Sequence, residues 1–232
     1  MLFKDSHLLA DMLRTDGFAF IPSWRTNTNT HEIAESLGNV IDTSLNSNGF
    51  SIKAVQTLQP RHKQPESRKV YSDIFGLSRF PLHTDLAYWY EPPHYLILRC
   101  LHGSSDVRTR ILSADIVEQI VGESVIRRAL VKPRHLPHGT PVCILPLRLP
   151  GMGKHSIRWD SVFLHPVNES ASQFSVAMAS IDNDSTLGVD VTLVNHGDTL
   201  IIDNWKAFHG RSSVPCSSVM RRLERIYLSA LH

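Results

Sequence analysis

Hydrophobic residues fall mostly into short runs separated by turn-forming residues, which predicts many short strands and few helices. The predicted strands cover residues 18–22, 52–58, 93–101, 109–113, 143–149, 156–163, 188–194, 199–203 and 224–228. Apolar residues at helical spacing predict helices over residues 6–14, 30–40, 114–130 and 170–181. This pattern favours a barrel or sandwich over a parallel sheet with helices on both faces.

Length and composition fit one globular domain over residues 1–232. Hydrophobic residues make up 42% of the chain and charged residues 20%. With 24 Lys and Arg against 22 Asp and Glu, the formal net charge is +2, which gives little support for a nucleic-acid partner. The three cysteines are far apart, the first residues lack a secretory pattern, and no apolar run is long enough to span a membrane. We therefore expect a cytoplasmic protein that does not enter a membrane.

The segment 80–85 contains the residues with the clearest chemistry. His83 and Asp85 are two positions apart, so in an extended segment both side chains leave the same face and can share one metal ion. His209, further along the chain, offers a third ligand. Two histidines and one carboxylate form the facial triad of non-haem Fe(II) oxygenases. An H-x-D pair also occurs in loops and strands that bind no metal, so this spacing alone leaves both interpretations open.

Several stretches together resemble one family. Residues 71–76 precede the metal motif at 80–85, and a Pro-Pro strand follows at 92–100. Arg158-Trp159-Asp160 is similar to an Arg-aromatic-Asp strand, and residues 202–211 with 221–228 are similar to a C-terminal signature. The chain thus resembles the TauD/TfdA-like Fe(II)/2-oxoglutarate dioxygenases, especially the clavaminate-synthase and carbapenem-synthase branch, from about Gly17 to Leu228. The resemblance implies a mainly β fold with flanking helices, a double-stranded β-helix (jelly roll, cupin-like).

The same resemblance implies a catalytic iron bound by His83, Asp85 and His209, with 2-oxoglutarate and dioxygen as cosubstrates. Arg221 lies twelve residues after His209 (221 − 209 = 12), where the family places the Arg that binds the distal carboxylate of 2-oxoglutarate. The planar guanidinium suits that role because it meets a carboxylate with two parallel hydrogen bonds. Arg225, four residues further along an extended strand, is expected on the same face.

The sequence leaves two points of this cosubstrate site undecided: which arginine binds the carboxylate, and whether Thr109 also binds it. Arg222 is expected to point away from the face that carries Arg221 and Arg225, but the sequence does not decide which of the three arginines binds the carboxylate. Thr109, 26 residues after His83 (109 − 83 = 26), matches a Thr that the family uses for the same carboxylate. The Gly-Gly that usually precedes this Thr is replaced here by Val-Arg, so the local turn must differ.

The candidate substrate-binding residues are Tyr88, Trp89, Arg158 and Arg225. Tyr88 and Trp89 directly follow the metal motif, and either arginine offers a partner for a substrate carboxylate. Arg158 has a structural alternative, an ion pair with Asp160 or another acid. The preferred substrate is a small amino-acid-like metabolite or an intermediate of secondary metabolism, oxidised by hydrogen abstraction with succinate and CO2 as coproducts.

The outcome of the reaction is narrowed by one residue. Related halogenases have Gly or Ala in place of Asp85, so the carboxylate here argues for hydroxylation, desaturation, cyclisation or epimerisation and against chlorination. Other functions remain as alternatives: a nucleic-acid- or protein-modifying dioxygenase of the same superfamily, a zinc hydrolase, and a non-enzymatic jelly-roll binding module. The sequence gives no information on oligomeric state.

Overall fold

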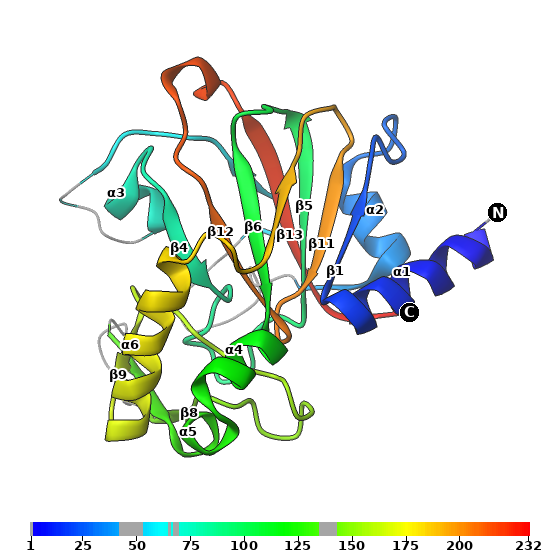
Figure 1. Cartoon of the computed structure of the whole chain (residues 1–232). Helices are drawn as coiled ribbons and strands as arrows, with labels where there is room; N and C mark the ends of the chain where they lie inside the picture. Colours follow the sequence, from blue (N-terminus) through cyan, green and yellow to red (C-terminus); the bar gives the residue numbers. More distant parts are fainter. Residues whose placement is uncertain (1, 42–52, 65, 67–69, 135–142) are drawn as a thin grey trace.

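Two antiparallel sheets face each other, and helices cover their outer faces (Figure 1). The computed structural model describes residues 2–41, 53–64, 66, 70–134 and 143–232. The helices are α1 (Leu2–Asp16), α2 (Thr30–Leu37), α3 (Tyr71–Phe75), α4 (Ala114–Val121), α5 (Glu123–Arg128) and α6 (Glu169–Asn183), with a short 3₁₀ turn η2 (Cys216–Ser218). None of the described helices is long and apolar enough to cross a bilayer.

The first sheet has six strands and covers the N-terminal helices. Its order is β1 (Phe18–Ile21), β11 (Thr199–Asp203), β5 (Tyr95–His102), β13 (Arg222–Leu231) and β2 (Gly38–Val40), with β3 (Gln56–Leu58) also paired with β13. Its outer face packs apolar residues against α1 and α2, including Ile97, Ile201 and Ile226. Strand β11 is buried along its whole length because both of its faces are covered.

The second sheet has four strands and lies against the inner face of the first. Its order is β10 (Val189–Thr192), β6 (Arg108–Ser113), β12 (Ala207–Arg211) and β4 (Phe80–His83). Buried residues of both sheets meet in one core, among them Leu98, Leu200 and Leu223 from the first sheet and Ile111 and Val191 from the second. Side chains that point into this space are shielded from bulk water.

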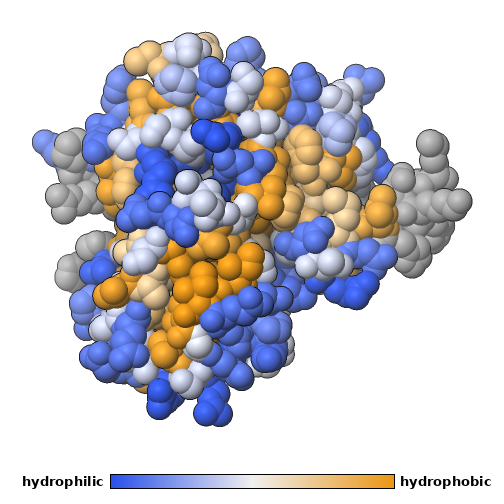
Figure 2. All heavy atoms as spheres, in the orientation of Figure 1, coloured by the Kyte–Doolittle hydropathy of each residue, from blue (hydrophilic) through white to orange (hydrophobic). Residues whose placement is uncertain are grey.

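A smaller layer lies at the other side of the second sheet, in the lower part of Figure 1. It contains helices α4, α5 and α6 and a three-stranded sheet ordered β8 (Leu145–Pro146), β7 (Leu130–Pro133) and β9 (Leu164–Pro166). Its core includes Val117, Trp159 and Phe174. The surface is mostly polar, and an apolar area lies beside α4 and α6 (Figure 2), where Ile120 and Val176 are exposed.

The mainly β architecture with flanking helices is as predicted, but several elements differ from the sequence expectation. The helix predicted over residues 114–130 is two helices, because Gly122 has a φ of 94° and ends α4 before α5 begins. The helix predicted over residues 30–40 ends at Leu37, and its N-cap is Asn29, whose side chain accepts the Glu32 N–H. The strand predicted over residues 52–58 begins at Ile52, which lies outside the described residues.

The prediction of a strand over residues 156–163 is wrong. Ile157 makes one isolated bridge with Arg148, and the rest of the segment is irregular. Its polar side chains explain this, because Asp160 Oδ1 accepts the backbone N–H groups of Val162 and Phe163 and so closes a turn. Residues 156–160 are all buried, so this part of the segment lies in the core without the hydrogen bonds of a strand.

Candidate metal centre and cosubstrate site

The three predicted ligands meet between the two sheets. His83 is the last residue of β4, Asp85 follows two residues later, and His209 lies in β12, where it is in register with His83. Asp85 Oδ1 lies 3.3 Å from His83 Nε2 and 3.6 Å from His209 Nε2. All three side chains are buried, and one ligand atom from each lies within 4.8 Å of the others. In the described residues this is the one such cluster of His, Cys, Asp or Glu.

The hydrogen bonds around the triad leave the right atoms free for a metal. His83 Nδ1 lies 2.9 Å from the carbonyl oxygen of Pro81, so this nitrogen donates and the Nε2 lone pair points toward Asp85. His209 Nδ1 is buried and has no hydrogen-bond partner in the described part of the chain. Two imidazoles and a carboxylate that converge on one point fit Fe(II) and leave coordination positions for cosubstrates.

Charges around Asp85 keep it ionised. Burial by itself would raise its pKa, but the Arg225 guanidinium and the two imidazoles hold that pKa well below the usual range. Burial and the neighbouring His83 lower the pKa of His209. Burial also acts to lower the pKa of His83, but the Asp85 carboxylate has the larger combined effect and raises it. The triad therefore contains an anionic ligand at neutral pH.

The second carboxylate oxygen of Asp85 is held by strand β13. Oδ2 accepts hydrogen bonds from Arg225 Nη1 at 3.0 Å and from the Tyr227 hydroxyl at 2.9 Å. Arg225 also donates from Nη2 to Gln56 Oε1 at 2.7 Å. These contacts fix the carboxylate so that Oδ1 alone faces the two histidines. Tyr227 and Gln56 are not among the residues predicted from the sequence. The alternation of β13 places Tyr227 on the face of Arg225, but no sequence signal indicates Gln56.

The backbone of Asp85 is fixed by Asn204, another residue that the sequence analysis did not single out. The Asp85 N–H donates to Asn204 Oδ1 at 2.7 Å, and Asn204 Nδ2 donates to the Asp85 carbonyl at 3.0 Å. The same amide nitrogen donates to the Pro93 carbonyl at 2.9 Å. Asn204 thus joins the segment after β4, which carries Asp85, to the turn that leads into β12, the strand that carries His209.

Replacing Asn204 with alanine will weaken metal binding while the three ligands remain in place. We expect a loss of about 10- to 100-fold in affinity, the range found when a group that orients a ligand is removed. Titration of the variant with Co(II) or anaerobic Fe(II) measures this directly. Asn195→Ala, in an exposed loop, is the matched control and should bind metal like the natural chain. Equal affinity in the two variants would contradict the positioning role of Asn204.

The aromatic side of the triad is built by α3. The Tyr71 ring stacks on the His83 imidazole with 4.2 Å between centroids, and its hydroxyl donates to Asp160 Oδ1 at 2.9 Å. Tyr88 lies next to this group, with its ring 5.9 Å from that of Phe163. Burial raises the pKa of Tyr88, so its hydroxyl is a donor at neutral pH.

Arg158 has partners other than those expected from the sequence. Its guanidinium donates to the backbone carbonyls of Ala87, Trp89 and Tyr90, and it makes no ion pair with Asp160. The side chain is fully buried. The observed role of Arg158 is to hold the segment that carries Tyr88 and Trp89, and its hydrogen bonds leave only Nε without a partner in the described residues.

Arg221 and Thr109 lie in the space between the sheets. Leu223 and Arg225 of β13 face this space. Arg221 directly precedes the strand and is buried, whereas Arg222, the first residue of β13, is exposed. Arg221 is 5% exposed, and its guanidinium has no hydrogen bond or ion pair within the described residues. Thr109 is also buried, 4% exposed. A buried guanidinium without a partner, with the Thr109 side chain in the same space, suits the carboxylate of a ligand.

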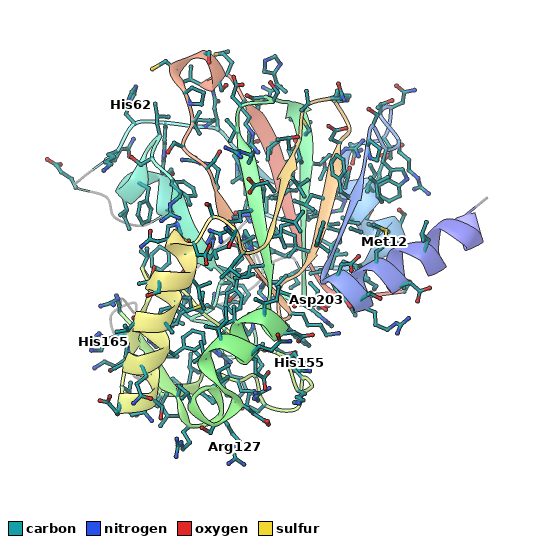
Figure 3. The ribbon with its side chains drawn as sticks, viewed as in Figure 1. Met12, His62, Arg127, His155, His165 and Asp203 are labelled. Carbon is teal, nitrogen blue, oxygen red and sulfur yellow. The ribbon has the colours of Figure 1, made fainter. Side chains whose placement is uncertain are left out.

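Several further polar residues make structural contacts. Arg211 stacks on the Phe80 ring at 3.6 Å and donates to the carbonyls of Gly76 and Ser78. His155 and His165 lie on the outside of the lower layer (Figure 3), and His155 pairs with acidic residues of α4. Asp203, at the lower end of the first sheet in the same figure, caps the turn that carries Asn204.

Solved structures with the same arrangement of elements are non-haem iron oxygenases. Asparagine oxygenase, solved with Fe(II), 2S,3S-3-hydroxyasparagine and succinate, has a TM-score of 0.70 and 17% identity over 97% of this chain and 79% of that chain. PvcB from Pseudomonas aeruginosa has a TM-score of 0.68 and 17% identity over 97% and 80% of the two chains. OrfP, solved with Fe, succinate and (3S)-hydroxy-L-Arg, has a TM-score of 0.66 and 17% identity over 98% and 80%.

This chain has the fold of these oxygenases. The double-stranded β-helix expected from the sequence resemblance is thereby confirmed. Its two main sheets stay separate in the described residues and do not join into a closed barrel. No family model matches the sequence, and no curated protein does so either. At this level of identity the likeness establishes the fold, and the evidence for an activity must come from the residues of the site.

Proposed function

We propose that the chain is a non-haem Fe(II)/2-oxoglutarate-dependent oxygenase acting on a small, amino-acid-like metabolite. In its simplest outcome, the substrate C–H bond becomes C–OH while 2-oxoglutarate and dioxygen are converted to succinate and CO2. The observation that carries this proposal is the pairing of a buried His-Asp-His cluster with the unpartnered Arg221 in the same space between the sheets. Neither feature stabilises the fold by itself, and a metal with a carboxylate cosubstrate explains both.

The metal would be held by Nε2 of His83, Nε2 of His209 and Oδ1 of Asp85. Bound iron with its cosubstrates would supply the oxidising power needed to remove a hydrogen atom from an unactivated carbon. The protein orients the ligands: the Pro81 carbonyl sets the tautomer of His83, and Arg225 and Tyr227 hold the Asp85 carboxylate. A carboxylate at position 85 fills the third ligand position, which supports hydroxylation, desaturation, cyclisation or epimerisation over halogenation.

The cosubstrate would place its distal carboxylate on Arg221, with the Thr109 hydroxyl as a second donor. Burial lowers the pKa of Arg221 to about 10, so the guanidinium stays cationic at neutral pH. Leu223 and Ile111 belong to the apolar core of the same space and exclude water from it. In such surroundings a charged hydrogen bond to a carboxylate is strong, because few water molecules compete for it.

The substrate would lie beside Asp85, with its carboxylate on Arg225. Arg225 keeps a quarter of its side chain exposed (25%), whereas the Asp85 side chain is 7% exposed, so Arg225 is the more accessible member of the pair. Gln56 Oε1 lies next to it and can accept a hydrogen bond from a substrate ammonium group. Tyr88 and Trp89 would line the same side of the site. The solved neighbours contain hydroxylated asparagine and arginine, which supports an amino-acid-like substrate for this chain.

Succinate release with a panel of L-amino acids tests this proposal. With Fe(II), 2-oxoglutarate and dioxygen present, we expect at least one amino acid to raise succinate formation, with equal amounts of 2-oxoglutarate and oxygen consumed. The product should differ from the substrate by one oxygen atom, by the loss of two hydrogen atoms or, after an epimerisation, by the configuration of one carbon alone. His83→Ala should remove the stimulation. Tight zinc binding without iron-dependent turnover would instead favour a zinc hydrolase or a binding module.

We place this activity in one domain spanning residues 1–232 of a cytoplasmic protein. The two main sheets and the lower layer each contribute to the site. The ligands and the two arginines lie on or next to β4, β12 and β13, and Arg158 lies beside core residues of the lower layer. Because the site draws on all three layers, limited proteolysis of the metal-bound protein should leave no smaller fragment that binds iron.

A further inference from the structure

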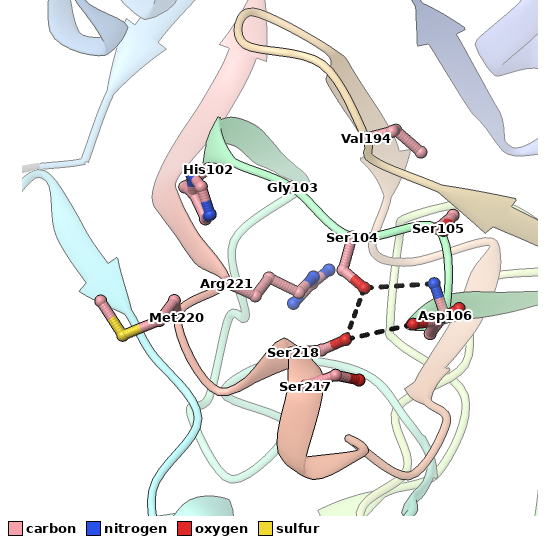
Figure 4. Close-up of a pocket in the computed structure, with 10 residues that line it drawn as sticks. All are labelled: His102, Gly103, Ser104, Ser105, Asp106, Val194, Ser217, Ser218, Met220 and Arg221. Atoms are coloured by element: carbon pink, nitrogen blue, oxygen red, sulfur yellow. Dashed lines mark hydrogen bonds between the residues drawn. The ribbon is translucent and has the colours of Figure 1, made fainter.

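A polar pocket lies at the upper end of the sheets, between the connection from β5 to β6 and the loop that contains η2 (Figure 4). Its volume is about 300 Å³. The lining is rich in hydroxyl groups, with a cationic and an anionic side chain: Ser104, Ser105, Asp106, Ser217, Ser218 and Arg221. A pocket of this volume can hold a metabolite of a few heavy atoms with its first hydration water.

Arg221 gives this pocket a buried positive charge that nothing in the described chain neutralises. The side chain is 5% exposed, and Figure 4 shows it extending from the start of β13 toward Ser104 and Asp106. Cys100 is close to it, but burial raises the pKa of that thiol to about 11, so it remains neutral and is no counterion. A buried guanidinium without an acid is costly unless a ligand supplies the anion.

Asp106 gives the pocket a negative charge as well. Its carboxylate accepts a hydrogen bond from Ser218 Oγ at 3.5 Å, and its backbone N–H donates to Ser104 Oγ at 3.1 Å. Ser104 and Ser218 also share a hydrogen bond of 2.8 Å, so the two loops are tied together. Asp106 and Arg221 both line the pocket, yet they form no ion pair with each other. The pocket therefore presents opposite charges that are separated by hydroxyl groups.

We propose that this pocket binds a small zwitterionic amino acid, with its carboxylate on Arg221 and its ammonium group near Asp106. A dicarboxylate or a phosphate would place a second negative charge beside Asp106, and a simple amine would leave Arg221 without an anion. The proposal rests on the proposed function in one respect: Arg221 is shared with the 2-oxoglutarate site. The amino acid would therefore compete with 2-oxoglutarate, so that its concentration regulates cosubstrate binding.

Calorimetric titration of the full chain tests the site with three small probes. L-serine carries both charges, succinate carries carboxylates without an ammonium group, and ethanolamine carries an ammonium group without a carboxylate. We expect L-serine to bind and ethanolamine not to bind. Asp106→Asn should weaken L-serine binding by about 10-fold or more while leaving succinate binding unchanged, because a charged partner of the ammonium group is lost. Glu123→Gln, an exposed acid on α5, is the control and should bind L-serine normally.

Three outcomes would overturn the proposal. The first is no L-serine binding by the natural chain, and the second is L-serine binding that Asp106→Asn does not change. The third is binding of succinate and 2-oxoglutarate alone, which would make the pocket only an extension of the cosubstrate site. Asp106→Asn should keep the anaerobic complex with Fe(II) and 2-oxoglutarate. If the natural chain forms no complex with Fe(II) and 2-oxoglutarate, the proposed function is refuted. The L-serine titration then still decides the proposal for the pocket.

Discussion

His83→Ala will abolish metal-dependent turnover and lower iron affinity by more than about 100-fold, the upper end of what loss of a ligand-orienting group causes. The physical reason is that His83 supplies one of three ligand atoms, and its ring also contacts Tyr71 and the His209 ring. Metal analysis after dialysis, together with succinate release, measures both effects. His165→Ala, at an exposed position, is the control and should behave like the natural chain. Retention of iron by His83→Ala would remove His83 from the ligand set.

Arg221→Ala will raise the concentration of 2-oxoglutarate needed for half-saturation by about 10- to 100-fold, because a hydrogen bond to a charged group contributes about 1.5–3 kcal/mol. The effect should appear in KM for 2-oxoglutarate, with much of kcat recovered at saturating cosubstrate. Arg222→Ala is the matched control, because Arg222 is exposed on the opposite face of β13.

The variants Arg221→Ala and Arg225→Ala together decide which arginine binds the distal carboxylate of 2-oxoglutarate, which the sequence left open. An unchanged 2-oxoglutarate requirement in Arg221→Ala, with a raised one in Arg225→Ala, would move the carboxylate site to Arg225. The structure favours Arg221, because its guanidinium has no partner in the described residues and can meet both oxygens of a carboxylate. Both Nη atoms of Arg225 already donate, one to Asp85 and one to Gln56, which leaves this arginine only single N–H groups for a further acceptor such as a substrate carboxylate.

The closeness of His83 and Asp85 could be predicted from the sequence, because residues two apart in an extended segment share a face. The structure brings the two side chains together, although β4 ends at His83 and Asp85 lies in the turn that follows. The same rule predicted that Arg221 and Arg225 face the interior and that Arg222 does not, and the burial of β13 agrees. His209 could be predicted as a ligand only with the help of the family resemblance, because its pairing with His83 depends on contacts between distant strands.

The residues that hold the ligands could not be predicted in this way. Asn204 and Tyr227 bind Asp85 from a distant turn and a distant strand, and Gln56 binds the Arg225 that holds Asp85. Local pattern carries no information on such long-range hydrogen bonds. The hydrogen-bond partners of Arg158 could not be predicted from local sequence either. A buried arginine near an acid suggests an ion pair, yet the observed partners are backbone carbonyls of a segment about seventy residues away, as in the 71-residue separation from Ala87. Charged side chains in a core take whichever acceptors the tertiary fold leaves unsatisfied.

The central claim is that one site binds iron and 2-oxoglutarate together. Anaerobic titration of the purified chain with Fe(II) and 2-oxoglutarate tests it most directly, by the weak visible charge-transfer absorption of the complex. We expect a saturable band that needs both components, that is lost in His83→Ala, and that requires more 2-oxoglutarate in Arg221→Ala. Absence of the band in the natural chain, with tightly bound zinc or no bound metal, would contradict the claim.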